Sequence, residues 1–170
     1  MMKEHVVKSF NDFKESCENY QKICELEGIT DQNTFENFYK NKVYFGFPRR
    51  KEKFRLIHVP GMSEWVAIDH GLADVIEHLN QKGYITKYCC SGHKFDKYTS
   101  GYIYFAALDK EKQTTLLDLA FGLTLSGQMY VKVEVHSDGE IIIRFRPNIP
   151  NEDNNCIMLE AIRNAVIDFI

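Results

Sequence analysis

The chain lacks several features by which common protein classes are recognised. No apolar run approaches the roughly 18 residues that a membrane-spanning helix needs. The first five residues lack the apolar stretch of a secretory signal peptide. No glycine-rich cofactor loop follows a predicted strand, and no two carboxylates stand out as a catalytic pair. We therefore expect a soluble cytoplasmic protein that makes no membrane contact.

Cysteine is present, but in no pattern typical of a disulfide framework or a closed metal site. The chain has an odd number of cysteines: Cys17, Cys24, Cys89, Cys90 and Cys156. Cys17 and Cys24 share one face of a predicted helix and lie about 10 Å apart at the helical rise, too far for a disulfide. Cys90-x-x-His93 supplies only half of a zinc site, with no second Cys-x-x-Cys or His-x-x-x-His. We expect reduced thiols and no bound metal.

An excess of charge of one sign is also missing. The chain has 21 Lys and Arg against 24 Asp and Glu, a formal net charge of -3. Such a balance gives no long-range attraction for nucleic acid or an anionic membrane, so an anionic partner would have to bind a local basic patch. The 170 residues, of which 44% are hydrophobic, are enough for a folded domain with a real core.

The hydrophobic pattern predicts a helical appendage over residues 1–42 and an α+β domain over residues 43–170. Ser9 is placed to cap a helix over residues 9–27, and Gly28 ends it. Apolar residues recur in that helix at a 3-4 spacing: Phe10, Phe13, Cys17, Tyr20 and Cys24. So narrow a stripe fits packing on the body of the protein or on a second copy, and the oligomeric state stays open. A second short helix follows Thr30.

The α+β domain is predicted to hold an antiparallel or mixed sheet with helices on one face. From residue 69 the expected order is α-β-β-α-β-β-α, because helical periodicity alternates with pairs of strand-like segments. Within it, residues 131–135 and 141–146 alternate between apolar and polar side chains. Asp138-Gly139 between them predicts a hairpin with a two-residue type I′ turn.

Reactive side chains concentrate at residues 89–93, Cys-Cys-Ser-Gly-His, which we call the lip. Strand alternation predicts that Thr86, Tyr88 and Cys90 share one face, whereas Cys89 turns to the apolar layer. Gly92 permits a left-handed turn that would bring His93 back to Cys90, where an imidazolium would lower the pKa of the thiol. A small buried thiol and an ordinary loop histidine explain the same residues. A catalytic role for Cys90 and His93 is therefore left open.

The surroundings of the lip suit an anionic ligand. Ser91 and Gly92 can offer backbone N–H groups as an anion nest. Positive and aromatic side chains that could hold a nucleotide or single-stranded nucleic acid are Lys87, Tyr88, Tyr104, His136, Arg144 and Arg146. The competing interpretation is that Arg144 and Arg146 pair with Glu134 across the hairpin while the tyrosines cover the sheet.

Several of these segments resemble known proteins. Leu79-Asn80, Gly83-Tyr84, Thr86, the lip and Tyr102-Ile103-Tyr104-Phe105 resemble small, mostly uncharacterised bacterial and phage proteins with LN-x-x-G-[YF]-x-T, C-S-G-H and Y-I-x-F patterns. That similarity covers about residues 45 to 107 and implies no assigned activity. Cys90-Ser91-Gly92 is also similar to the Ser-Cys-Ser-Gly-Arg motif of the methyltransferase family that acts late in tRNA wybutosine synthesis, where the motif belongs to a site linked to S-adenosylmethionine and RNA. Here Cys89 stands in place of the first serine and His93 in place of the arginine.

Two functions follow as expectations. The first is a small binding protein that holds a nucleotide-like or other anionic ligand, or a macromolecular partner, at the lip; the resemblance to phage proteins implies a role in host interaction. The alternative is an enzyme, either methyltransferase-like and acting on RNA or dependent on a cysteine. The sequence leaves the cofactor open.

Overall fold

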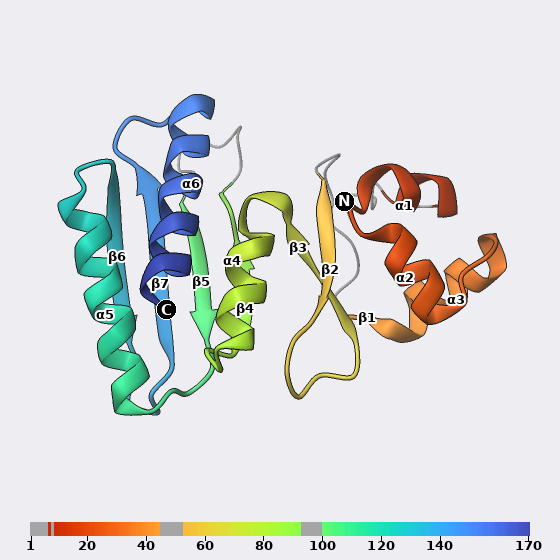
Figure 1. Cartoon of the computed structure of the whole chain (residues 1–170), viewed down its shortest axis with the longest axis horizontal. Helices are drawn as coiled ribbons and strands as arrows, with labels where there is room; N and C mark the ends of the chain where they lie inside the picture. Colours follow the sequence, from red (N-terminus) through yellow and green to blue (C-terminus); the bar gives the residue numbers. More distant parts are fainter. Residues whose placement is uncertain (1–6, 8, 45–52, 93–99) are drawn as a thin grey trace, which may run out of the picture. The chain divides into compact units, whose positions relative to one another are not determined.

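The computed structural model describes residues 7, 9–44, 53–92 and 100–170, in which six helices and seven strands form an α+β fold, as predicted (Figure 1). The chain divides into two compact units, residues 1–73 and 74–170. The boundary predicted at residues 42 and 43 falls inside the first unit, and as a division between domains it stays a prediction. Within the described ranges, no helix combines the length and the apolar character needed to cross a bilayer.

The first unit joins three short helices to a three-stranded sheet. Its elements are α1 (Phe10–Ser16), α2 (Tyr20–Glu27), α3 (Gln32–Lys42), β1 (Val43–Tyr44), β2 (Phe54–His58) and β3 (Trp65–Asp69). The strand order is β1-β3-β2, with β1 parallel and β2 antiparallel to β3. Phe13 and Ile23 are buried with Phe35, Phe38 and Phe54 in one core cluster, so the apolar stripe of the first helices is used within this unit.

The helix predicted over residues 9–27 is broken at Cys17, where the structure has two helices. Ser9 caps α1 through a capping box with Asp12, and Gly28 ends α2 with a φ of +66°, both as predicted. Between the helices the N–H of Glu18 donates to Phe54 O at 2.9 Å. The Asn19 side chain donates to Leu56 O at 2.8 Å and accepts from Leu56 N at 3.1 Å. The helix is therefore interrupted where Glu18 and Asn19 form hydrogen bonds with the edge of β2, which is distant in sequence.

The second unit has the predicted order α-β-β-α-β-β-α. It comprises α4 (His70–Gln81), which begins in the first unit, then β4 (Thr86–Cys90), β5 (Gly101–Phe105), α5 (Lys110–Leu125), β6 (Met129–Val135), β7 (Ile141–Pro147) and α6 (Glu152–Phe169). The strands form an antiparallel sheet in the order β4-β5-β7-β6. Figure 1 shows α4, α5 and α6 over the same face of this sheet. We call that face the inner face and the opposite one the outer face.

The inner face carries the core of the second unit. Alternate residues of the central strands are buried: Ile103, Phe105, Ile141, Ile143 and Phe145. They meet apolar residues of the helices, among them Leu116 and Ile162. A Cβ at Gly101 would lie 2.2 Å from Phe145 Cε2 and 2.8 Å from Cys90 O. Only glycine therefore lets β5 start between this ring and β4.

The connection from α4 to β4 explains the Leu-Asn-x-x-Gly-Tyr-x-Thr segment. The Asn80 Nδ2 group donates to Ile76 O at 2.8 Å and to Thr86 Oγ1 at 2.9 Å, while Asn80 Oδ1 accepts from Thr86 N at 3.0 Å. Gly83 turns the chain with a φ of +80°. Asn80 and Thr86 are buried, so this part of the pattern holds the helix to the sheet.

Candidate functional site

A β-bulge decides which side chains of β4 reach the outer face. Thr86 pairs with Phe105 and Tyr88 with Tyr104, which leaves Lys87 as an extra residue. Thr86 therefore points to the inner side, and the prediction that it shares a face with Tyr88 is wrong. Beyond the bulge the alternation holds.

The register beyond the bulge places the two vicinal cysteines on opposite faces. Cys89 pairs with Ile103, which is buried on the inner face, and Cys90 pairs with Tyr102 on the outer face. The predicted orientation of both thiols is thus confirmed. Cys90 borders the aromatic residues of the outer face.

The outer face gathers aromatic and charged residues from all four strands. Cross-strand pairing sets two rows, since directly paired side chains project to the same side. One row is Tyr88, Tyr104, Ile142 and Glu134; the other is Cys90, Tyr102, Arg144 and Lys132. Arg146 and its partner Tyr130 extend the face beyond the second row.

Three cations on this face lie over tyrosine rings. The guanidinium carbon of Arg144 is 5.6 Å from the Tyr102 ring centre, and that of Arg146 is 5.0 Å from the Tyr130 ring centre. The Lys87 Nζ atom is 5.4 Å from the centre of the Tyr104 ring. These separations fall within the range of a cation–π interaction.

Glu134 forms ion pairs with two of the cations on the outer face. Its Oε1 atom lies 3.1 Å from Lys132 Nζ and 3.2 Å from Arg144 Nε. Hydrogen bonds from Lys132 and then from Arg144 lower the pKa of the Glu134 carboxyl. The expected cross-hairpin ion pair thus exists for Arg144. Arg146 has no carboxylate partner among the described residues and lies over Tyr130 instead.

A second cluster surrounds Glu140 at the end of the hairpin. Its carboxylate forms an ion pair with Lys87 and accepts a hydrogen bond from the hydroxyl of Tyr104. The hydrogen bond from Lys87 is the main cause that lowers the pKa of Glu140, and the bond to Glu140 raises the pKa of Tyr104. The Tyr104 ring centre lies 6.0 Å from that of Tyr88 and 6.3 Å from that of His136.

The hairpin turn brings Glu140 to this cluster, and it is not the predicted two-residue turn. The N–H of Gly139 donates to His136 O at 3.0 Å, and the N–H of His136 donates to Glu140 O at 2.9 Å. Gly139 has a φ of +88°. The connection therefore has three residues, with Gly139 as the left-handed residue that follows a turn. The Asp138 side chain accepts a hydrogen bond from Glu140 N at 3.1 Å, which stabilises this three-residue turn.

The described part of the lip is largely enclosed. Gly92 has a φ of +87°, the left-handed conformation predicted for it. Ser91 and Gly92 are buried and Cys90 is half-buried. His93 lies outside the described residues, so its pairing with Cys90 stays a prediction. In the ranges that the structure describes, no group of three or more His, Cys, Asp or Glu side chains could hold a metal ion.

Most of the residues that were predicted to contact a ligand lie on one surface. Lys87, Tyr88, Tyr104 and His136 gather near Glu140, and Arg144 and Arg146 stand over tyrosines. Glu140 and Tyr130 also belong to this surface and were not predicted from the sequence. Extending the alternation of Lys132 and Glu134 by one step would have found Tyr130. The position of Glu140 depends on the turn geometry and had no sequence signal.

Comparison with protein-family models finds no match to this chain, and comparisons with curated proteins and with solved structures find no significant match.

Proposed function

We propose that the outer face of the four-stranded sheet binds a nucleotide-like anionic ligand. The observation that carries this proposal is the set of three cation–tyrosine pairs on a single sheet face. Such pairs offer a ligand a flat aromatic surface and a positive group within a few ångströms of each other. A nucleotide needs both, because its base stacks and its phosphates are anionic.

Two of the tyrosines are exposed enough to serve as stacking platforms, and Tyr102 and Tyr104 are half-buried. Tyr88 and Tyr130 have exposed fractions of 43% and 51%, which is high for aromatic side chains on a sheet. Stacking of one base on an aromatic ring contributes about 1–3 kcal/mol and tolerates any base, since every base has a π face. The face is therefore suited to a nucleotide without strong selection among bases.

The local charge supports an anion. Among the described residues, the face carries four cations, Lys87, Lys132, Arg144 and Arg146, against the carboxylates of Glu134 and Glu140 and the nearby Asp138. The chain as a whole has a net charge of -3, so the positive excess here is a local property. Arginine binds phosphate in a planar bidentate geometry, and the Arg146 guanidinium is the cation best placed to do so.

The lip would border the bound ligand. Cys90 stands beside Tyr102 in the register, so a base stacked on that ring would lie near the thiol. The alternative of an RNA-directed methyltransferase or a cysteine-dependent enzyme shares this surface and adds a reaction at the lip. Both functions require ligand binding at this surface, and the described residues support the binding step.

Calorimetric titration with ATP, adenosine and pyrophosphate tests the proposal. We expect ATP to bind more tightly than either fragment, because only ATP uses both the rings and the cations. Tyr102→Leu should weaken ATP binding by about 5- to 150-fold, the loss of one stacking contact. Arg146→Gln should weaken it by about 2- to 30-fold.

Lys112→Gln is the matched control. Lys112 also lies over a tyrosine, 6.0 Å from the Tyr84 ring centre, and also pairs with a carboxylate, that of Asp109, but it belongs to α5. This variant should bind ATP like the unaltered protein. Failure of all three probes to bind, or equal affinities in the three variants, would overturn the proposal.

A further inference from the structure

Helix α5 is apolar on two opposite sides. Its buried side, which includes Leu116, Leu119 and Leu123, faces the sheet. On the other side, Leu117, Phe121 and Leu125 have exposed fractions of 41%, 65% and 70%. A helix that covers a sheet normally turns charged and polar residues outward. The outward apolar stripe of α5 therefore indicates a surface that is covered in the working state of the protein.

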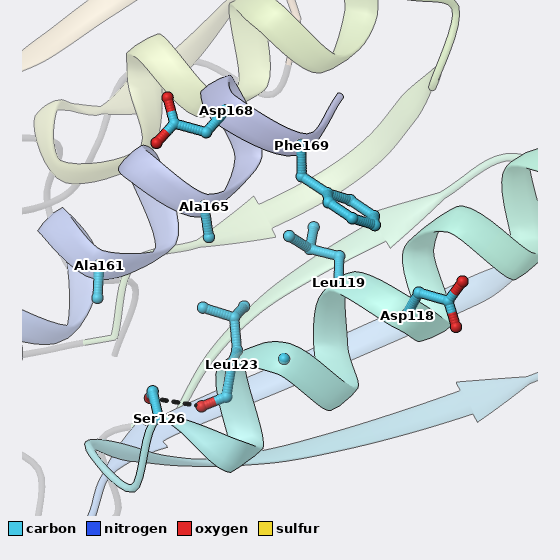
Figure 2. Close-up of a pocket in the computed structure, with 9 residues that line it drawn as sticks. Asp118, Leu119, Leu123, Ser126, Ala161, Ala165, Asp168 and Phe169 are labelled. Carbon is cyan, nitrogen blue, oxygen red and sulfur yellow. Dashed lines mark hydrogen bonds between the residues drawn. The ribbon is translucent and has the colours of Figure 1, made fainter.

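A groove runs beside this stripe, between α5 and α6 (Figure 2). Its volume is about 370 Å³, and its walls include Leu119, Gly122 and Leu123 of α5 and Ala161, Ala165 and Phe169 of α6. Figure 2 shows the Leu119 and Leu123 side chains directed toward α6 and the Phe169 ring directed toward α5. At Gly122 no atom lies within 4 Å of the position of an added Cβ. The groove is thus open at the middle of α5.

The stripe and the groove are complementary to each other. Leu117, Phe121 and Leu125 form one ridge at a spacing of four residues, and Asp118, Gly122 and Ser126 form the next. Gly122 has no side chain, so the second ridge has a gap at this residue, and an added Cβ there would meet no atom within 4 Å. In ridges-into-grooves packing, the ridge of one helix enters a groove of another. Phe121 is therefore a projecting side chain that lies next to the gap it would fill in an identical molecule.

The order of the side chains also suits a two-fold contact. In two antiparallel copies of α5 related by an axis between Phe121 and Gly122, Phe121 lies opposite Gly122 of the second copy, and Leu117 lies opposite Ser126 of that copy. A two-fold axis brings the same surface of both copies together, as an isologous interface requires. The two Asp118 carboxylates would lie on opposite sides of this axis, roughly 10 Å apart along the helix direction, and would not face each other.

The exposed area is sufficient for a modest dimer. Leu117, Phe121, Leu125 and Phe169, which is 55% exposed, together present apolar surface on the order of 500 Å² per copy. A biological interface should bury at least about 1,000 Å² over both partners, and two such patches reach this value. Flanking polar residues add a rim.

We propose that α5 binds a second copy of this chain in antiparallel orientation, with Phe121 of each copy seated over Gly122 of the other. This interface lies on the helical side of the second unit and is independent of the proposed nucleotide site on the outer face.

Sedimentation velocity of the full chain over a series of concentrations tests this interface. We expect a reversible change from monomer to dimer. Phe121→Asp should weaken the dimer by at least about 30-fold, the loss typical of a central interface residue. Gly122→Leu should do the same by filling the gap in the ridge, while the monomer should keep its fold because an added Cβ meets no atom within 4 Å.

The control is Ile157→Asp, which places the same charge at an α6 residue that is 51% exposed and does not line the groove. This variant should dimerise normally. A monomer at every concentration would overturn the proposal, as would a dimer that persists in both Phe121→Asp and Gly122→Leu. Native mass spectra that show a lipid or a different protein bound to a monomer at this face would overturn it as well.

Discussion

The two faces of the four-stranded sheet are built from the same strands, but the inner face packs against helices and the outer face carries exposed charged and aromatic residues. On β7, Ile141, Ile143 and Phe145 are buried against helices, whereas Arg144 and Arg146, which alternate with them, lie over tyrosine rings. Neighbouring residues thus belong to different environments. Side chains that stabilise the fold and side chains of the proposed binding face are therefore only one residue apart along a strand.

This separation leads to a testable expectation. Substitutions on the inner face should lower the free energy of unfolding, because they remove packed apolar surface. Substitutions on the outer face should leave the fold nearly unchanged and alter ligand binding, because their contacts are exposed to solvent.

The largest effect is expected for Phe145→Ala. The ring is 2% exposed and fills the space over Gly101, so its removal leaves a cavity in the core. We expect a loss of about 3–5 kcal/mol in the free energy of unfolding, measured by urea denaturation. The adjacent Arg144→Ala should cost less than about 1 kcal/mol. Equal losses in these neighbours would contradict the separation of the faces.

A smaller effect is expected where a polar group is buried on the inner side. Asn80→Ala removes the acceptor for Thr86 N and leaves that N–H group buried without a partner. The expected loss is about 1–3 kcal/mol. Thr114→Val is the control, since its exposed hydroxyl bonds only to Lys110 O in its own helix, and it should change stability by less than about 0.5 kcal/mol. A loss for Asn80→Ala as small as that of the control would show that this connection is not structural.

The smallest effect concerns the Glu140 cluster of the outer face. The pKa of Glu140 is lowered, chiefly by the hydrogen bond from Lys87. Its contribution to stability is therefore present above the unfolded pKa of about 4.3 and is lost as the pH falls through the lower folded pKa. Glu140→Gln should flatten the pH dependence of stability in this acidic range. Glu160→Gln, an exposed glutamate of α6, should leave the slope as it is in the unaltered protein, and identical slopes in all three proteins would refute the role of this cluster.

The sequence predicted those parts of the fold that depend on local pattern. The order of elements from α4 to α6, the Ser9 cap and the inward orientation of Cys89 all follow from periodicity and capping. The break at Cys17 was not predictable, because it is compensated by the edge of β2, far along the chain. The bulge at Lys87 likewise depends on pairing with β5.

For the candidate site, too, the orientation of single side chains was predicted, but their arrangement across strands was not. The outward positions of Arg144 and Arg146 follow from strand alternation, and both were expected to contact a ligand. Their arrangement over Tyr102 and Tyr130 depends on cross-strand register, which a single strand does not encode. Glu140 was missed because the turn has three residues where two were expected.

The most direct test of the proposed binding face is a map of amide chemical shifts during titration with ATP. The account predicts that the shifts concentrate on outward residues of the second unit, with Tyr88, Tyr102, Tyr104 and Arg146 among the most affected, while α5 and α6 change little. Shifts confined to those helices or to the first unit, or no shifts with ATP at saturating concentration, would contradict it.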